Sequence, residues 1–299
     1  MNKGFQVGWW LIVITIFIIF GVSCIAADWE GQYFPTILLE VGVIIPILLG
    51  VLYAKKNNSI KDILGIEPVP IHILPLALLL TAGAQYFITY ITMPVQSLLI
   101  VMFGSDTATS QILVPNNILE FIKAFFAICV VAPIIEELLC RGVLIKLFER
   151  YGASVAIVSS SLAFTLLHFE ARSFFQLFFV GALFGVFRLY TGSVLITILM
   201  HSFNNLLSLC QLILFKQGHV SLLNIIILGL AILFPFIIYY TFTKGRNYFG
   251  YVNMMKEKTG FSLGALLCGV MFIGYNLLLF IIRFLNGDCL RDLLFLIGG

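Results

Sequence analysis

The chain has 299 residues, of which 61% are hydrophobic and 10% are charged, and its formal net charge is +3. A soluble domain carries about 25% charged residues, so this composition excludes a water-soluble enzyme, a nucleic-acid-binding protein and a disordered protein. The class that remains is an all-α, polytopic bundle of transmembrane helices. We expect membrane lipid as its partner and no nucleic acid.

Apolar stretches long enough to cross a membrane follow one another along the chain. A bilayer core takes about 20 residues per helix, which predicts about nine spans, or about eight if one stretch does not cross. Residues 95–103 are also apolar, but they are few and follow Pro94, so we expect a re-entrant or interfacial stretch there. The predicted spans are 5–27, 33–54, 70–92, 118–148, 152–169, 173–190, 193–215, 220–243 and 261–283.

The orientation of the bundle follows from its basic residues. Lys and Arg gather at the span ends that a cytoplasmic N-terminus would place inside, among them Lys55, Lys56, Lys244 and Arg246. The positive-inside rule therefore predicts a cytoplasmic N-terminus. The first apolar stretch is longer than the core of a cleavable signal peptide, so we interpret it as a retained anchor. The sequence thus predicts an integral, multi-pass membrane protein.

The fourth predicted span carries an E-E-x-x-x-R pattern of charged residues. Such groups are expensive inside a bilayer, so each one is a functional candidate. Glu137 and Arg141 are four residues apart and share one helix face, which predicts an ion pair between them. Glu136 points about 100° away and is less compensated, which suits it to proton transfer. A buried structural ion network is the alternative interpretation of both carboxylates.

Two histidine motifs follow on later spans. Phe164 and His168 form F-x-x-x-H on the fifth span, and His201 and Asn205 form H-x-x-x-N on the seventh. His201 and Asn205 share a helix face, so an imidazole and an amide donor can converge on one point. One histidine in a membrane helix is commonly a packing residue, but two histidines with a glutamate pair predict a catalytic site.

Other features of the spans have structural interpretations. Glu40 in the second span has no charged neighbour in sequence, which favours a protonated carboxyl hydrogen-bonded to another helix. Gly181 and Gly185 form G-x-x-x-G, which predicts close packing of helices. Pro133 lies three residues before Glu136 and is expected to bend the fourth span.

The three motifs, in this order on successive helices, resemble those of the CPBP intramembrane proteases. That family includes the type II CAAX prenyl endopeptidases and bacterial Abi-like, bacteriocin-processing and immunity proteins. The resemblance implies a catalytic core at residues 118–210. Transmembrane helices at 1–117, with three spans and an interfacial loop, and at 211–299 would flank it, in the plasma membrane of a bacterium.

The resemblance also implies catalytic roles. Glu136 would activate a water molecule together with His168, and His201 and Asn205 would stabilise the oxyanion of the tetrahedral intermediate. These roles agree with general chemistry, because peptide hydrolysis needs a base for water, an acid for the leaving amine and donors for the developing negative charge.

The expected site also includes supporting residues, and its residue types make zinc dependence an alternative. The resemblance implies that Glu137 and Arg141 orient and balance the charges. Glu136, His168 and His201 are also a conceivable set of zinc ligands, but no H-E-x-x-H helix accompanies them. We therefore favour an enzyme without a metal or cofactor, with zinc dependence as the alternative.

The predicted activity is hydrolysis of a peptide bond in or near the membrane. The substrate would be a peptide or a membrane protein, with or without a prenyl group. A non-catalytic immunity or scaffold protein on the same fold is the alternative from another class. A proton-coupled transporter is disfavoured, because transporters are commonly built from two corresponding halves and the charged helix around Pro133 has no second copy in the sequence.

Overall fold

The structure is a computed structural model, and it describes residues 3–26, 33–56, 58–69, 71–103, 115–216, 229–237, 262–286 and 288. Within these ranges every regular element is helical, which confirms the all-α bundle. The helices outside the fourth span are α1 (Lys3–Ala26), α2 (Tyr33–Ala54), α3 (Ile60–Leu64), α4 (Leu74–Phe103), α8 (Ala153–Leu167), α9 (Phe174–Thr191), α10 (Val194–Lys216) and α13 (Leu263–Leu285).

Seven helical segments within the described ranges are long and apolar enough to cross a membrane, and they correspond to seven of the nine predicted spans. The chain is therefore an integral, multi-pass membrane protein. The fifth predicted span is α8, which has 15 residues and is shorter than a full crossing requires. The eighth, 220–243, lies largely outside the described residues, of which 229–237 are helical.

The prediction for residues 95–103 is wrong. They do not form a re-entrant or interfacial stretch, because α4 continues through Pro94 to Phe103 as one helix of 30 residues. A proline removes only its own N–H bond and disturbs one turn, and membrane helices tolerate this where the freed groups find other partners. Because the chain is apolar on both sides of Pro94, the helix continues through the proline.

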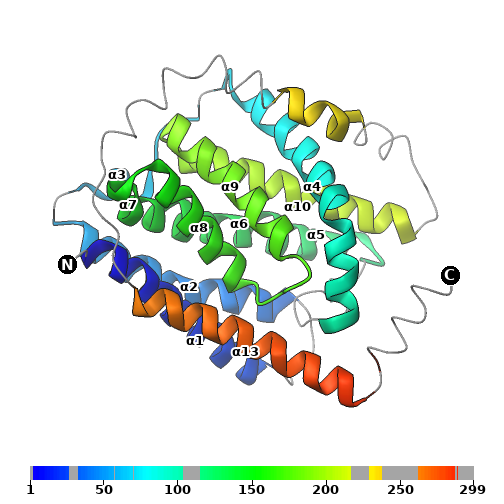
Figure 1. Cartoon of the computed structure of the whole chain (residues 1–299). Helices are drawn as coiled ribbons and strands as arrows, with labels where there is room; N and C mark the ends of the chain where they lie inside the picture. The colour runs from blue at the N-terminus through cyan, green and yellow to red at the C-terminus, as the bar shows by residue number, and fades with distance from the viewer. Residues whose placement is uncertain are drawn as a thin grey trace.

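The helices form two groups with the fourth span between them. Figure 1 shows α1, α2 and α13 side by side along one side of the bundle, and α1 contacts both of the others. On the other side, α4, α9 and α10 contact one another. The fourth span touches α2 on one side and α10 on the other, so its side chains can face both groups.

The packing around the fourth span is tight. Its buried residues Leu139 and Phe148 join one apolar cluster with Ile12 of α1 and with residues of α2 and α8. Lipid tails are as apolar as these side chains, so the contacts hold by van der Waals packing rather than by exclusion of water. Small residues allow the close approach: a Cβ atom on Gly8 would lie 2.6 Å from the Phe148 ring.

The fourth span is one long helical segment, 118–151, in which the helix geometry changes repeatedly. Two π-helical segments flank the short α-helix that carries the two glutamates, and π-turns often occur at functional sites. The segments are α5 (Ile118–Ala124), η1 (Phe125–Val131), α6 (Ala132–Glu137), η2 (Leu138–Leu144), α7 (Ile145–Phe148) and η3 (Glu149–Tyr151).

Candidate active site

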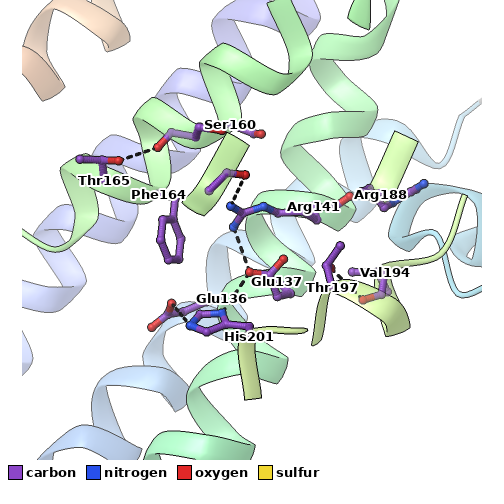
Figure 2. Close-up of polar contacts among 12 residues, drawn as sticks. Glu136, Glu137, Arg141, Ser160, Phe164, Thr165, Arg188, Val194, Thr197 and His201 are labelled. Carbon is purple, nitrogen blue, oxygen red and sulfur yellow. Dashed lines mark hydrogen bonds and ion pairs between the residues drawn. The ribbon is translucent and has the colours of Figure 1, made fainter. Parts of the chain in front are cut away.

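The ion pair that the E-E-x-x-x-R spacing predicts is present. Arg141 Nη1 donates to Glu137 Oε1 at 3.0 Å, and both side chains are completely buried (Figure 2). Removing either charge from such a pair leaves the other uncompensated in an apolar environment, which costs about 3–5 kcal/mol. The pair is therefore a fixed part of the bundle.

Further contacts hold the guanidinium of Arg141 from α9 and α8. Its Nη2 donates to the carbonyl oxygen of Gly181 at 2.9 Å. The ring of Phe164 lies 4.6 Å from its Cζ atom and the ring of Phe184 lies 5.7 Å away, within the range of cation–π contacts. A Cβ atom on Gly181 would lie 3.0 Å from Nη2, so the glycine provides the space for this approach.

A second arginine ties the same turn of the fourth span to the end of α9. Arg188 Nε donates to the carbonyl oxygen of Arg141 at 2.9 Å. The guanidinium of Arg188 lies directly against Gly65, which has a positive φ of 66° and follows α3. The carbonyl of Gly65 in turn accepts a bond from the backbone N–H of Val194 at 2.8 Å. The loop after α3 thus anchors the start of α10.

His201 lies between the two glutamates. Its Nδ1 atom is 3.1 Å from Glu137 Oε1, and its Nε2 atom is 3.9 Å from Glu136 Oε2. The rings of Phe164 and Phe184 pack on the imidazole with centroids 5.7 and 5.6 Å away. Glu137 Oε1 therefore joins Arg141 and His201, while Glu136 Oε2 is buried and has no hydrogen-bond partner among the described residues.

His168 lies at the C-terminal end of α8. Its Nδ1 atom is 2.8 Å from the carbonyl oxygen of Phe164, and the two rings have centroids 4.7 Å apart. Because a carbonyl only accepts, Nδ1 donates this bond, and Nε2 is left to accept or release a proton. Phe164 contacts both His168 and His201, but no hydrogen bond joins His168 to Glu136 or Glu137 among the described residues.

Asn205 bonds to the backbone of the first π-helical segment. Its Nδ2 atom donates to the carbonyl oxygen of Ile128 at 2.9 Å. This carbonyl lacks its usual partner, because the N–H of Ala132 bonds to Ala127 and Pro133 has no N–H at all. One amide hydrogen of Asn205 thus satisfies the π-helix, and the second is available to a ligand.

Among the described residues, no three side chains of His, Cys, Asp or Glu converge in a way that could hold a metal ion. Zinc dependence through Glu136, His168 and His201 stays the alternative to an enzyme without a metal, and the proposed reaction uses only side chains of this chain.

Several neighbours of the site were not predicted from the sequence. The contact of Arg188 with Arg141 joins residues 47 positions apart, and no local pattern signals it. Glu40 is buried, one of its carboxyl oxygens has no partner among the described residues, and its charge interacts with that of Glu136. The isolated carboxylate in an apolar span was the signal for Glu40, but no sequence pattern indicates which residue it faces.

Comparison with known proteins supports the interpretation of the motifs. The model of the family described as "Type II CAAX prenyl endopeptidase Rce1-like" matches residues 118–207. Searches of curated proteins and of solved structures find no match. The matched segment contains all three motifs and every residue of the site described above except Glu40 and Gly65. An Rce1-like domain is thus found at residues 118–207, and it matches the family that the ordered motifs resemble.

Proposed function

We propose that the protein is an intramembrane endopeptidase in which Glu136 activates the attacking water. One observation carries this proposal: the buried, unpartnered Oε2 atom of Glu136 faces Nε2 of His201 across 3.9 Å. That distance is too long for a direct hydrogen bond, and two polar atoms so placed can share a bridging water. A water held there would have a carboxylate on one side and an imidazole on the other.

The reaction would begin when Glu136 takes a proton from this water. The water oxygen then attacks the carbonyl carbon of the scissile peptide bond to form a tetrahedral intermediate. The C–N bond of this intermediate breaks as the proton passes from Glu136 to the leaving amine nitrogen. His168 is the second group for these transfers, because its Nδ1 bond to Phe164 leaves Nε2 available. General acid–base groups of this kind contribute about 10²–10⁴-fold to a rate.

The oxyanion that forms on the carbonyl needs hydrogen-bond donors in a dry environment. The second amide hydrogen of Asn205 is one donor. His201 is the other, because a protonated imidazole donates through both nitrogens, and Glu137 at 3.1 Å from Nδ1 stabilises its positive charge. Arg141 balances Glu137, so the network around the site has no uncompensated charge at that carboxylate.

The family also supports a substrate class. An Rce1-like domain favours a peptide or protein substrate at the membrane, and a prenylated C-terminus ending in a C-a-a-X sequence is the form that its description names. Unprenylated apolar peptides are the alternative. The distinction is testable with a pair of probes that differ only in the prenyl group.

The test is cleavage of a fluorescent peptide that ends in a farnesylated C-a-a-X sequence, beside the same peptide without farnesyl. The purified protein in lipid vesicles should cleave at least one of them, and Glu136→Gln should lower the rate about 100-fold or more. His168→Ala should lower it similarly. Glu149→Gln is the matched control, because Glu149 pairs with Lys146 at the end of the same span. Equal rates of cleavage by wild type and Glu136→Gln would exclude Glu136 as the base, whereas no cleavage by the wild type would favour the scaffold or immunity role.

A further inference from the structure

Helix α10 carries a polar stripe that continues beyond the proposed catalytic residues. His201, Asn204, Asn205 and Ser208 are spaced i, i+3, i+4 and i+7, so they lie on one helix face. All four lie inside a membrane-spanning segment, where polar side chains are rare unless they face protein or a functional path. The stripe therefore begins at the proposed oxyanion site and leads away from it along the helix.

Helix α4 contributes one residue to this stripe. Gln85 is buried, with 6% of its surface exposed, and its Nε2 atom donates to Ser208 Oγ at 2.7 Å. Ser208 Oγ donates in turn to the carbonyl oxygen of Asn204 at 3.1 Å. The side chains of Gln85 and Ser208 are thus linked to each other and to the backbone of Asn204, between α4 and α10, which lie side by side in Figure 1.

Two oxygen atoms in this linked group have no donor. Among the described residues, none donates a hydrogen bond to Gln85 Oε1 or to Asn204 Oδ1, and both atoms are buried. A buried acceptor without a partner costs about 1–3 kcal/mol. Both orphaned atoms are acceptors, so the group that completes them must supply donors.

An unwound peptide supplies such donors. A peptide bond inside a helix has its backbone groups bonded within the helix, and hydrolysis requires that this segment be extended. An extended segment in a membrane must find acceptors for its N–H groups, because lipid offers none. Four residues of helix from Asn204 to Ser208 correspond to about 6 Å, and N–H groups on one side of an extended chain recur about every 6.6 Å.

We propose that Gln85 and Asn204 form a subsite that binds the extended backbone of the substrate next to the scissile bond, with Oε1 and Oδ1 accepting hydrogen bonds from two of its N–H groups. This subsite rests on the proposed peptidase function. It selects substrates by their ability to unwind rather than by a particular side chain, since every residue other than proline offers the same donor.

The test replaces individual N–H groups of the peptide with ester oxygens. The farnesylated and unfarnesylated peptides of the cleavage assay are made with one ester at each amide in turn. Their Kd values are measured by fluorescence polarisation with the Glu136→Gln protein in nanodiscs, where the peptide stays intact. Esters at two positions, two residues apart, should weaken binding about 5–10-fold each, which corresponds to about one neutral hydrogen bond.

Second-site variants then assign each N–H group to its acceptor. Adding Gln85→Leu should abolish the ester effect at one position and leave the other, and Asn204→Leu should do the reverse. Gln96→Leu is the matched control, because Gln96 lies on the same face of α4 three turns away and bonds to Thr92. It should leave both ester effects unchanged, and thermal unfolding of each variant would show that the bundle is intact.

The outcomes separate this subsite from the peptidase function. Binding is measured in a variant that does not need to cleave, so failure of the wild type to cleave would count against the function alone. The subsite is overturned if neither peptide binds, if no ester changes Kd, or if the ester effects persist in Gln85→Leu and Asn204→Leu. Persistence would mean that the polar stripe carries water instead of peptide.

Discussion

Arg141 and Asn204 both lie in membrane-spanning helices, but the groups around them are held in different ways. Around Arg141, contacts from three helices meet: Glu137 of α6, the Phe164 ring of α8, and Gly181, Arg188 and the Phe184 ring of α9. Arg141 Nε and Glu137 Oε2 have no hydrogen-bond partner among the described residues, so this region is held by its ion pair and ring contacts rather than by complete hydrogen bonding. Around Asn204, two buried oxygens have no donor among the described residues. The first region thus contains a buried ion pair that packing fixes, whereas the second has neutral acceptors for which we propose a ligand.

The largest expected effect comes from breaking the buried ion pair between Glu137 and Arg141. Arg141→Met would leave Glu137 buried without its cation, and we expect a loss of about 3–5 kcal/mol in the free energy of unfolding. Thermal unfolding in detergent measures it. The double variant Glu137→Gln with Arg141→Met removes both charges and should recover at least half of that loss. If the double variant is no more stable than the single one, the pair is not what stabilises this region.

Asn205 and Asn204 allow a direct comparison of the two regions with neighbouring residues of one type. Asn205→Leu orphans the carbonyl of Ile128, so it should lower the free energy of unfolding by about 1–3 kcal/mol. Asn204→Leu removes an acceptor that has no donor and one long hydrogen bond, from Nδ2 to Asn205 Oδ1 at 3.4 Å, so it should change stability little. Chemical denaturation of both variants side by side provides the measurement. Equal losses would contradict the difference between the regions.

The two glycines of the G-x-x-x-G pair differ in how closely their neighbours approach them. A Cβ atom on Gly181 would lie 3.0 Å from Arg141 Nη2, whereas on Gly185 its nearest neighbour, in Ile157, would be 3.5 Å away. Alanine is favoured over glycine within a helix by about 0.5–1 kcal/mol. We therefore expect Gly185→Ala to stabilise the protein by about that amount and Gly181→Ala to destabilise it by about 1 kcal/mol. Opposite signs in thermal unfolding would bear this out.

The smallest expected effect is that of a chelator. Because no three suitable side chains converge in the described part of the chain, we expect the cleavage rate to change by less than about twofold after incubation with a zinc chelator. A matched sample with zinc restored is the control. Loss of activity that zinc restores would instead support the metal-dependent alternative and would require a different arrangement of Glu136, His168 and His201.

The sequence predicted much of this site because its residues obey short-range rules. Glu137 and Arg141 pair as their spacing of four requires, and His201 and Asn205 share a face of α10. What could not be predicted depends on how helices meet. The bond from Arg188 to Arg141 and the bond from Asn205 to Ile128 join separate spans, and amphipathic patterns say little about packing partners when lipid and protein are equally apolar.

The error at Pro94 has a related cause. A proline signals a local defect in a helix, but whether the helix ends there depends on the surroundings of that turn. Pro133 illustrates the other result, because its missing N–H accompanies a π-helical segment and an orphaned carbonyl that Asn205 then satisfies. In α4 the helix simply continues through its proline, whereas in the fourth span the proline accompanies a carbonyl that bonds to another helix.

The two π-helical segments also affect the direction in which Glu136 and Glu137 point. Each wide turn accommodates an extra residue, so the residues beyond it are rotated by about 100° relative to an uninterrupted α-helix. Glu136 and Glu137 therefore point in a different direction, relative to the ends of the span, from the one that an uninterrupted α-helix would give them. Deleting one of residues 138–140 would close the second wide turn and leave the residues after it on the same faces, but it would shorten the spacing between Glu137 and Arg141 from four residues to three. The length of this span is thus a functional property, and a substitution that preserves it is tolerated more readily than a single insertion or deletion.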